Sequence, residues 1–384
     1  MEFDWTEEQT AYRKRLKELI KRELPKDWWE NYAHDGPYPP NLMAFARRFA
    51  KVLASEKLVV RHWPKEYGGI DADAWDHIII SEEMWSEGEP RSSLYMGSNW
   101  AGPAIMKYGT EEQKLKHLND IAEGNVLWCQ GFSEPEAGSD LASLRTSAEP
   151  QPDGSYILNG GKIWTSYAHG ADMMFVLARV GGGTGRKGVT CFLVPVRSDG
   201  VTVKTIPAMQ SAYDFHEITL ADAHLPESAR LGEEGNGWDI VRYILHHERV
   251  GLARYEYAQR ALDYAVEILK ERGRFDDPLV QAEAARCLAM TEAARLLAYV
   301  VVDSRVLDLP PSADTNISRF AMIQSDNAVA SFVASYLPDA LTEPGDGRLR
   351  GHYKTGITSG IAAGAAEIQL NLIASQYLQL PRET

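Results

Sequence analysis

The chain has 384 residues, of which 44% are hydrophobic and 24% charged, as is typical of a soluble globular protein with two or three structural units. Its net charge of −14 opposes nucleic-acid binding, whose affinity comes mainly from the neutralisation of phosphates. No run approaches about 18 uninterrupted apolar residues, so we expect no membrane-spanning helix and no membrane partner. The cysteines are widely spaced, and the acidic amino terminus lacks the basic and apolar regions of a secretory signal. The sequence therefore predicts a cytoplasmic protein.

Residues 1–125 have the pattern of a helical domain. The segment opens with Thr6-Glu-Glu-Gln9, which resembles a capping box, and apolar residues then recur at helical spacing from Tyr12 to Ile20. The same texture returns in residues 41–53 and 76–86. We therefore predict several helices in this first domain.

Residues 126–230 change to a β pattern. Short runs rich in β-branched and aromatic residues are separated by turns that contain Gly and Asp. Closely spaced short strands favour a compact antiparallel sandwich or barrel. The runs are Tyr156-Ile-Leu158, Met173–Ala178, Val189–Val196, Val201-Thr-Val203 and His216–Leu220.

Residues 231–384 return to helical periodicity and keep it to the end. The periodic stretches are 238–272, 278–307, 317–337 and 362–377. The order helical, β, helical makes the chain an α+β protein, for which we predict three domains.

Two motifs in the middle segment carry possible cofactor chemistry. In Gly131-Phe-Ser-Glu-Pro-Glu-Ala-Gly-Ser-Asp140, a strand end runs into a turn of small and hydroxyl-bearing residues. Backbone N–H groups and hydroxyls in such a turn can hold a pyrophosphate, although most glycine-rich turns only reverse the chain. In Asn159-Gly-Gly-Lys-Ile-Trp-Thr-Ser166, the indole of Trp164 can cover one face of a planar cofactor or pack inside the β core. Neither motif alone establishes a cofactor site.

Together and in this order, the motifs resemble the acyl-CoA dehydrogenase family, which has the pattern T/S-E-P-x-A-G-S-D followed by N-G-x-K-x-W. The resemblance covers nearly the whole chain. Its further stretches are Trp63-Pro-Lys-Glu-Tyr-Gly-Gly69, Tyr108-Gly-Thr-Glu-Glu-Gln-Lys114, His247-Glu-Arg249 and Glu367-Ile-Gln369. It implies a flavoenzyme that uses FAD to desaturate an acyl-CoA thioester between its α and β carbons. The implied fold has an N-terminal helical domain, a middle antiparallel β-barrel or sandwich, and a C-terminal four-helix bundle.

By this resemblance, residues of both motifs contact the flavin. Phe132 and Ser133 would line the pyrimidine side of the ring, and Ser139 would bind the pyrophosphate. Trp164 would lie against the ring, and Ser166 would hydrogen-bond near its N5 atom.

Residues of the last domain are also implied to contact the cofactor. An Arg-x-x-Phe pair in the family reaches the FAD of a neighbouring subunit, and here it matches Arg272 and Phe275, while Glu367 falls near the adenosine. Family members are usually tetramers, and some bacterial ones are α2β2 with the catalytic base in only one type of chain. Glu136 replaces a usual Gly, and Ala365 replaces a common flavin-contacting Thr. Both a homotetramer and an α2β2 heterotetramer therefore stay open.

The implied reaction needs a carboxylate that removes the α-proton while hydride leaves the β-carbon for the flavin. In many family members this base lies in the loop before the last helix, where the chain has Ala363, which cannot accept a proton. A second arrangement in the family puts the base on the first long helix of the last domain, and that position here is Glu248. On an uninterrupted helix its face also holds Ile244, Gly251 and Tyr255. We therefore predict Glu248 as the base, against the plainer reading of a solvated helical Glu.

The remaining expectations concern metals, substrate and partners. Adjacent His246 and His247 would point about 100° apart on a helix, so we expect no shared metal ion. A base on this helix is associated in the family with branched or bulky acyl groups. The expected electron acceptor is an electron-transferring flavoprotein. Two alternatives stay open: an oxidase in which reduced flavin meets O₂, and a partner subunit that supports assembly without chemistry of its own.

Overall fold

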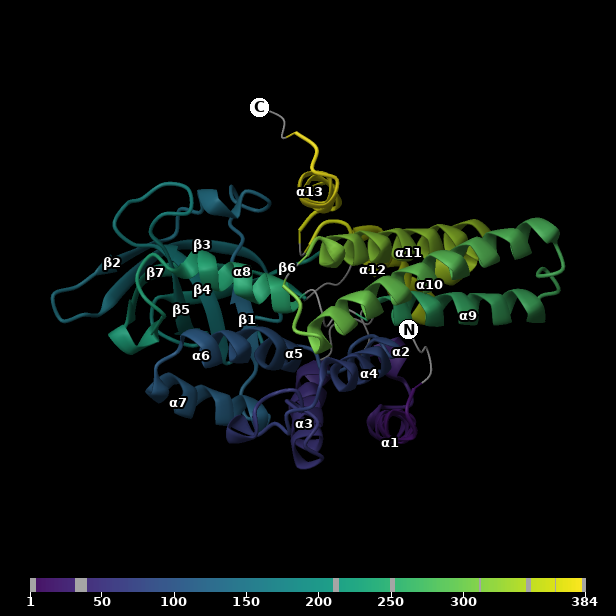
Figure 1. Cartoon of the computed structure of the whole chain (residues 1–384), viewed down its shortest axis with the longest axis horizontal. Coiled ribbons are helices and arrows are strands. Elements are labelled where there is room, and N and C mark those ends of the chain that lie inside the picture. Colours follow the sequence, from purple (N-terminus) through teal and green to yellow (C-terminus); the bar gives the residue numbers. More distant parts are fainter. Residues whose placement is uncertain are drawn as a thin grey trace. The chain divides into compact units, whose positions relative to one another are not determined.

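The computed structural model describes residues 5–31, 40–209, 214–248, 253–310, 312–342, 347–362 and 364–381. Packing divides the chain into two compact units (Figure 1). The sheet unit contains Pro40–Asp71 and Arg91–Glu248, and the bundle unit contains Met1–Pro39, Ala72–Pro90 and Arg249–Thr384. The helical, β, helical order and the α+β class are confirmed. The three domain ranges stay a prediction.

The sheet unit is built around a sheet whose described strands follow the order β6-β7-β3-β2-β4-β5-β8, with β1 beside β4. Most neighbours run antiparallel, as predicted, but β1 runs parallel to β4, and β2 meets β4 in parallel at one residue pair. Every residue of β4 and β5 except those at strand ends is buried, so their sequences are continuous apolar runs. The strands are β1 (Trp128–Gly131), β2 (Ser147–Pro150), β3 (Tyr156–Ser166), β4 (Met173–Arg179), β5 (Val189–Pro195), β6 (Val201–Ile206), β7 (Phe215–Leu225) and β8 (Arg230–Leu231).

Helices of the same unit pack around this sheet (Figure 1). They are α3 (Pro40–Ser55), α5 (Leu94–Met96), α6 (Gly102–Tyr108), α7 (Glu111–Ala122) and α8 (Gly237–Glu248), with short helices η1 (Lys65–Tyr67), η3 (Leu141–Ser143) and η4 (Glu227–Ala229). A π-helical segment, η2 (Gly97–Ala101), joins α5 to α6. Such segments are often found at functional sites. Helix α8 packs against β5, α6 and η2, which places its face beside the core of the sheet unit.

The bundle unit is formed by α9 (Tyr255–Glu271), α10 (Pro278–Val306), α11 (Asp314–Tyr336) and α12 (Gly347–Thr358), which lie side by side (Figure 1). Its other helices are α1 (Glu7–Glu23), α2 (Trp28–Asn31), α4 (Ala74–Trp85), η5 (Pro338–Leu341), α13 (Ala366–Leu372) and η6 (Ile373–Tyr377). Helix α1 begins with the expected capping box at Thr6 and Gln9. No helix in the described ranges has the length and apolar character needed to cross a membrane.

The single helical stretch expected over residues 238–272 is wrong. Helix α8 ends at Glu248 and α9 begins at Tyr255, while Ala253 belongs to no helix. Gly251 lies outside the described residues, so the placement of Glu248, Gly251 and Tyr255 on one helical face stays a prediction.

A buried carboxylate ties α1 and α4 to the bundle. Glu82 of α4 is only 1% exposed and accepts hydrogen bonds from the hydroxyls of Tyr255 on α9 and Tyr299 on α10, each at 2.7 Å. Arg13 of α1 also donates to this carboxylate, at 2.5 Å. A buried charge is tolerated only when it is paired and hydrogen-bonded, and Glu82 meets both conditions. Two helices of the predicted first domain thus share one packed unit with the C-terminal helices.

Candidate active site

The loop that follows β1 brings the two sequence motifs together. The backbone N–H of Ile163 in β3 donates to the carbonyl oxygen of Ser133 at 2.9 Å. Phe132 is 7% exposed, and its ring centroid lies 6.0 Å from that of Phe175 in β4. Ser133 is half-buried. An aromatic ring and a hydroxyl of the first motif therefore lie beside the strand that carries the second.

A buried ion pair fixes this loop. Lys162 Nζ lies 2.6 Å from Glu134 Oε1 and 3.3 Å from the carbonyl oxygen of Phe132. Glu134 also accepts the backbone N–H groups of Arg145 at 2.6 Å and Thr146 at 2.9 Å. Burial lowers the pKa of Lys162 to about 8, although the adjacent carboxylate opposes that shift. Burial alone would raise the pKa of Glu134, but Lys162 and the hydrogen bonds lower it, so both groups stay charged at neutral pH.

Both residues of this pair lie in the sequence motifs, but no role was predicted for either. The signal was present, because Glu134 belongs to Ser-Glu-Pro in the first motif and Lys162 belongs to Gly-Lys-Ile-Trp in the second. Lys162 is fully buried in a strand that is elsewhere partly exposed, and a buried lysine requires a partner because an unpaired one would be costly.

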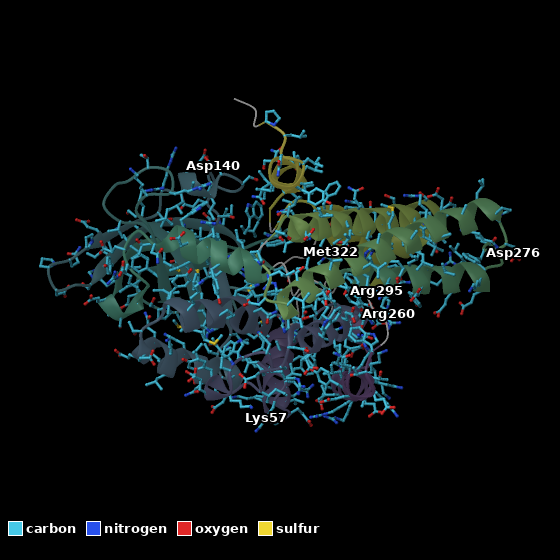
Figure 2. The ribbon with its side chains drawn as sticks, in the orientation of Figure 1. Lys57, Asp140, Arg260, Asp276, Arg295 and Met322 are labelled. Carbon is cyan, nitrogen blue, oxygen red and sulfur yellow. The ribbon has the colours of Figure 1, made fainter. Side chains whose placement is uncertain are left out.

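The end of the first motif forms an open turn. Gly138, Ser139 and Asp140 are exposed, and Figure 2 labels Asp140. A Cβ added to Gly138 would meet no atom of the described chain within 4 Å. Glu136, which departs from the family pattern, is exposed as well. The turn therefore leaves its backbone N–H groups and the Ser139 hydroxyl room to meet an anionic group.

Trp164 lies in a bulge of β3 and points away from the core. Its φ is 60°, and the pairing of β3 with β7 shifts register between Lys162 and Thr165. The side chain is 54% exposed and meets Phe215 edge-on at 6.1 Å. Ser166, which is half-buried, pairs with Phe215 across the strands. An exposed indole beside a hydroxyl can cover one face of a flat aromatic group, and the alternative of a core-packed Trp164 is wrong.

A small apolar pocket lies within the sheet unit where α5, η2, β1, β4 and α8 meet. It is lined by Met96, Trp100, Ala101, Trp128, Cys129, Gln130, Phe175 and Ile244. Its volume is about 10 Å³, room for about one water molecule. The indole nitrogens of Trp100 and Trp128 are buried and have no hydrogen-bond partner in the part of the chain that the structure describes. Periodicity could not identify this lining, because it comes from five separate elements.

Glu248, the predicted base, is the last residue of α8. It follows Ile244 of the pocket lining by four positions, which is about one helical turn. The side chains of Glu248, His246 and His247 lie outside the described residues, and so does Ala363. The assignment of the base therefore stays a prediction.

Two of the cofactor contacts predicted for the last domain, Arg272 and Phe275, lie between α9 and α10 of the bundle unit, and Figure 2 labels Asp276 of the same turn. Arg272 caps the C-terminal end of α9 and forms an ion pair with Asp339 at 2.8 Å. Both members of the ion pair are substantially exposed, so water and salt weaken this contact and Arg272 can exchange it for another anion. Glu367 is exposed in the first turn of α13.

The chain matches the sequence models of acyl-CoA dehydrogenases along most of its length. The N-terminal domain model matches residues 6–125, the middle domain model 129–223 and the C-terminal domain model 235–378. A curated relative, acyl-CoA dehydrogenase IpdE1 of Mycobacterium tuberculosis, is 31% identical over 347 residues, which cover 88% of each chain.

Solved structures of the family share the fold. The Tcur3481-Tcur3483 steroid ACAD superposes with a TM-score of 0.91 at 27% identity and covers all of both chains. The ChsE4-ChsE5 complex of Mycobacterium tuberculosis gives a TM-score of 0.87 at 26% identity, again over the whole of both chains. The chain therefore belongs to the acyl-CoA dehydrogenase family, a family of FAD-dependent oxidoreductases.

Proposed function

We propose that the protein desaturates an acyl-CoA thioester between its α and β carbons, with Glu248 as the base that removes the α-proton. The observation that carries this proposal is the position of α8. Its residue Ile244 lines the apolar pocket, and Glu248 stands about one turn further along the same helix. The loop position that serves as base in many family members holds Ala363. Of the family's two base positions, the one on α8, Glu248, therefore carries the carboxylate.

The residues of the sheet unit suit FAD, which accepts the β-hydride when it is bound. Trp164 would cover one face of the flavin ring, and the Ser166 hydroxyl would donate to its edge. Phe132 and Ser133 would line the pyrimidine side, and the open turn at Ser139 would hold the pyrophosphate. The exposed indole, the half-buried hydroxyls and the unobstructed turn support this set.

Catalysis by a carboxylate requires a dry site, because the α-proton of a thioester is only weakly acidic. Removal from water also raises the pKa of a carboxyl group toward neutrality, where a base works best. The apolar lining near Ile244 is the part of the sheet unit that can exclude water. Arg272 and Phe275 from a second subunit, with Glu367, would complete the cofactor site.

We propose a branched or bulky acyl group as the substrate and an electron-transferring flavoprotein as the acceptor. The relative named a steroid ACAD supports the bulky group. Relatives solved as complexes of two chain types support an α2β2 assembly, and a homotetramer is the alternative. The pocket in the sheet unit, at about 10 Å³, has no room for a bulky group unless Met96 or Trp100 moves.

A panel of acyl-CoA esters tests this function. Mixed anaerobically with the FAD-loaded protein, straight-chain, branched and steroid-like esters should differ in how fast they bleach the flavin band near about 450 nm, and bulky esters should bleach it fastest. Re-oxidation by an electron-transferring flavoprotein should outpace peroxide formation in air. Rapid peroxide release would establish an oxidase instead. If the protein bound FAD only when produced with a second chain, and if substrate bleached the flavin only when that second chain was catalytically intact, the protein would be a silent partner subunit.

A further inference from the structure

Two histidines form a hydrogen-bonded pair behind the Trp164 bulge. His169 Nδ1 lies 2.9 Å from His216 Nε2, and the rings stack at 4.7 Å between centroids with an interplanar angle of 30°. His216 belongs to β7 and is fully buried, whereas His169 is half-buried in the turn after β3. His216 pairs directly with Thr165 across the two strands. The pair thus touches the backbone between Trp164 and Ser166.

The hydrogen bonds fix the tautomer of each ring. His216 Nδ1 lies 3.1 Å from the carbonyl oxygen of Thr165, which can only accept, so this nitrogen carries the proton. A neutral His216 then has a lone pair on Nε2, and His169 must donate to it from Nδ1. If Nε2 of His216 were protonated too, a neutral His169 could still accept from it at Nδ1 as the Nε2–H tautomer, whereas protonation of both rings would set two N–H groups against each other. The observed contact therefore requires that at least one of the two rings is neutral.

The segment that the pair contacts is strained. Trp164 and Tyr167 both have φ near 60°, a backbone conformation that residues other than glycine rarely adopt. Such a conformation persists only where the surroundings hold it. Two bonds anchor the bulge to the start of β7: the one from His216 to Thr165, and one from the Tyr167 N–H to the carbonyl oxygen of Asp214 at 2.8 Å.

We infer that His169 and His216 form a positioning pair, which holds the Trp164–Tyr167 bulge in the conformation that presents Trp164 and Ser166 to FAD, and that the pair breaks when both rings are protonated. The inference rests on the proposed function, because Trp164 and Ser166 contact FAD only in that proposal. Neither histidine is a catalytic residue. His216 acts through its hydrogen bond to the backbone of Thr165, and His169 acts through its hydrogen bond to His216.

Charged groups surround the pair on several elements. Asp214 at the start of β7 favours a protonated imidazole, whereas Arg197 after β5 disfavours it and donates to the carbonyl oxygen of His169 at 3.4 Å. From α3, Arg47 forms an ion pair with Asp172 at 2.8 Å and donates to the carbonyl oxygen of Gly170. The charges of Asp214 and Arg197 shift the pKa of His169 in opposite directions, so burial determines the direction of the net shift.

Burial lowers the pKa of His169 from its ordinary 6.5 to about 4, and it lowers the pKa of His216 as well. Between pH 6.5 and about 4, an opened bulge therefore binds protons that the closed pair does not bind. Acid in this range favours the opened segment, and the stabilisation is fully present above pH 6.5.

Two substitutions of His216 test the inference in the full-length protein. His216→Leu removes the donor to Thr165 and should weaken FAD binding about tenfold at pH 7.5, as expected for one lost hydrogen bond. His216→Asn keeps an amide N–H near the Nδ1 position and does not titrate. It should bind FAD within about twofold of wild type, and its affinity should lose the share of the acid dependence below pH 6.5 that comes from His216, while His169 still titrates. Flavin fluorescence titrations from pH 4.5 to 8 measure both.

His117→Leu is the matched control. His117 is also buried in the sheet unit, contacts Trp128 edge-on and has its pKa lowered to about 4 by burial, but it lies on α7. This variant should leave the FAD affinity within about twofold of wild type, as expected when no contact to the bulge is lost. Wild-type affinity in His216→Leu, or an equal loss in His117→Leu, would overturn the inference.

A readout without cofactor separates this inference from the proposed function. Long-range ¹⁵N spectra of the histidine-labelled apoprotein should show both His169 and His216 as Nδ1–H tautomers at pH 7.5. An Nε2–H tautomer for either ring would overturn the pair. If the wild-type protein bound no FAD at all, the proposed function would fail, and these spectra would still decide whether the pair exists.

Discussion

Glu248→Gln is expected to slow flavin bleaching by acyl-CoA about 10²- to 10⁴-fold, the usual contribution of a general base. Glutamine keeps the shape of the side chain but cannot accept the α-proton, so the chemical step alone should suffer. The protein should still purify with bound FAD, because Glu248 is not among the proposed cofactor contacts. Stopped-flow absorbance with a saturating ester, under anaerobic conditions, measures the bleaching rate.

Asp239→Asn provides the control on the same helix. Asp239 lies in the first turn of α8, its side chain is 64% exposed, and the substitution likewise replaces a carboxylate by an amide. Its bleaching rate should match wild type. Placing a carboxylate at the alternative position, as Ala363→Glu in the Glu248→Gln background, should restore part of the rate if the two positions address the same substrate atom. Bleaching at the wild-type rate in Glu248→Gln would remove Glu248 from the mechanism.

Lys162→Met is expected to destabilise the protein by about 3–5 kcal/mol, because it leaves the Glu134 carboxylate buried without its cation. The free energy of unfolding, measured by urea denaturation, should show the loss. The loop from Phe132 to Glu134 should also loosen, since Lys162 bonds to both ends of it. We therefore expect weaker FAD binding as well as lower stability.

Two comparisons check the cause of that loss. The double variant Glu134→Gln/Lys162→Met removes the unpaired charge and should recover part of the stability. Arg286→Met breaks the exposed pair with Glu283, whose side chains are 52% and 45% exposed, and should cost no more than about 1 kcal/mol. Equal effects at the buried and the exposed pair would contradict the electrostatic explanation.

Sequence patterns predicted the class and many of the elements because these depend on local periodicity and turn chemistry. The capping box at Thr6 and the apolar runs of β4 and β5 are examples. The non-helical position of Ala253 was missed, because the amphipathic pattern continues across it. Short β2 carries little pattern in its four residues, Ser147–Pro150.

The candidate site was predictable only where a motif named its residues. Phe132, Ser133, Trp164 and Ser166 came from the family resemblance. The left-handed backbone at Trp164 could not be predicted, because glycine is the usual signal for that conformation. His169 and His216 are 47 residues apart, so their contact depends on the β3–β7 register and leaves no mark in either segment.

The contacts of Glu82 also constrain how the chain can fold during synthesis. Its hydroxyl partners Tyr255 and Tyr299 follow it by 173 and 217 residues. The Glu82 carboxylate of α4 therefore cannot form these two hydrogen bonds until most of the polypeptide has left the ribosome. Contacts this distant in sequence slow folding, and a fragment that ends near residue 125 would keep α1 but lack α9 and α10, which also pack on α4. Such a fragment should be prone to aggregate, whatever its helical propensity.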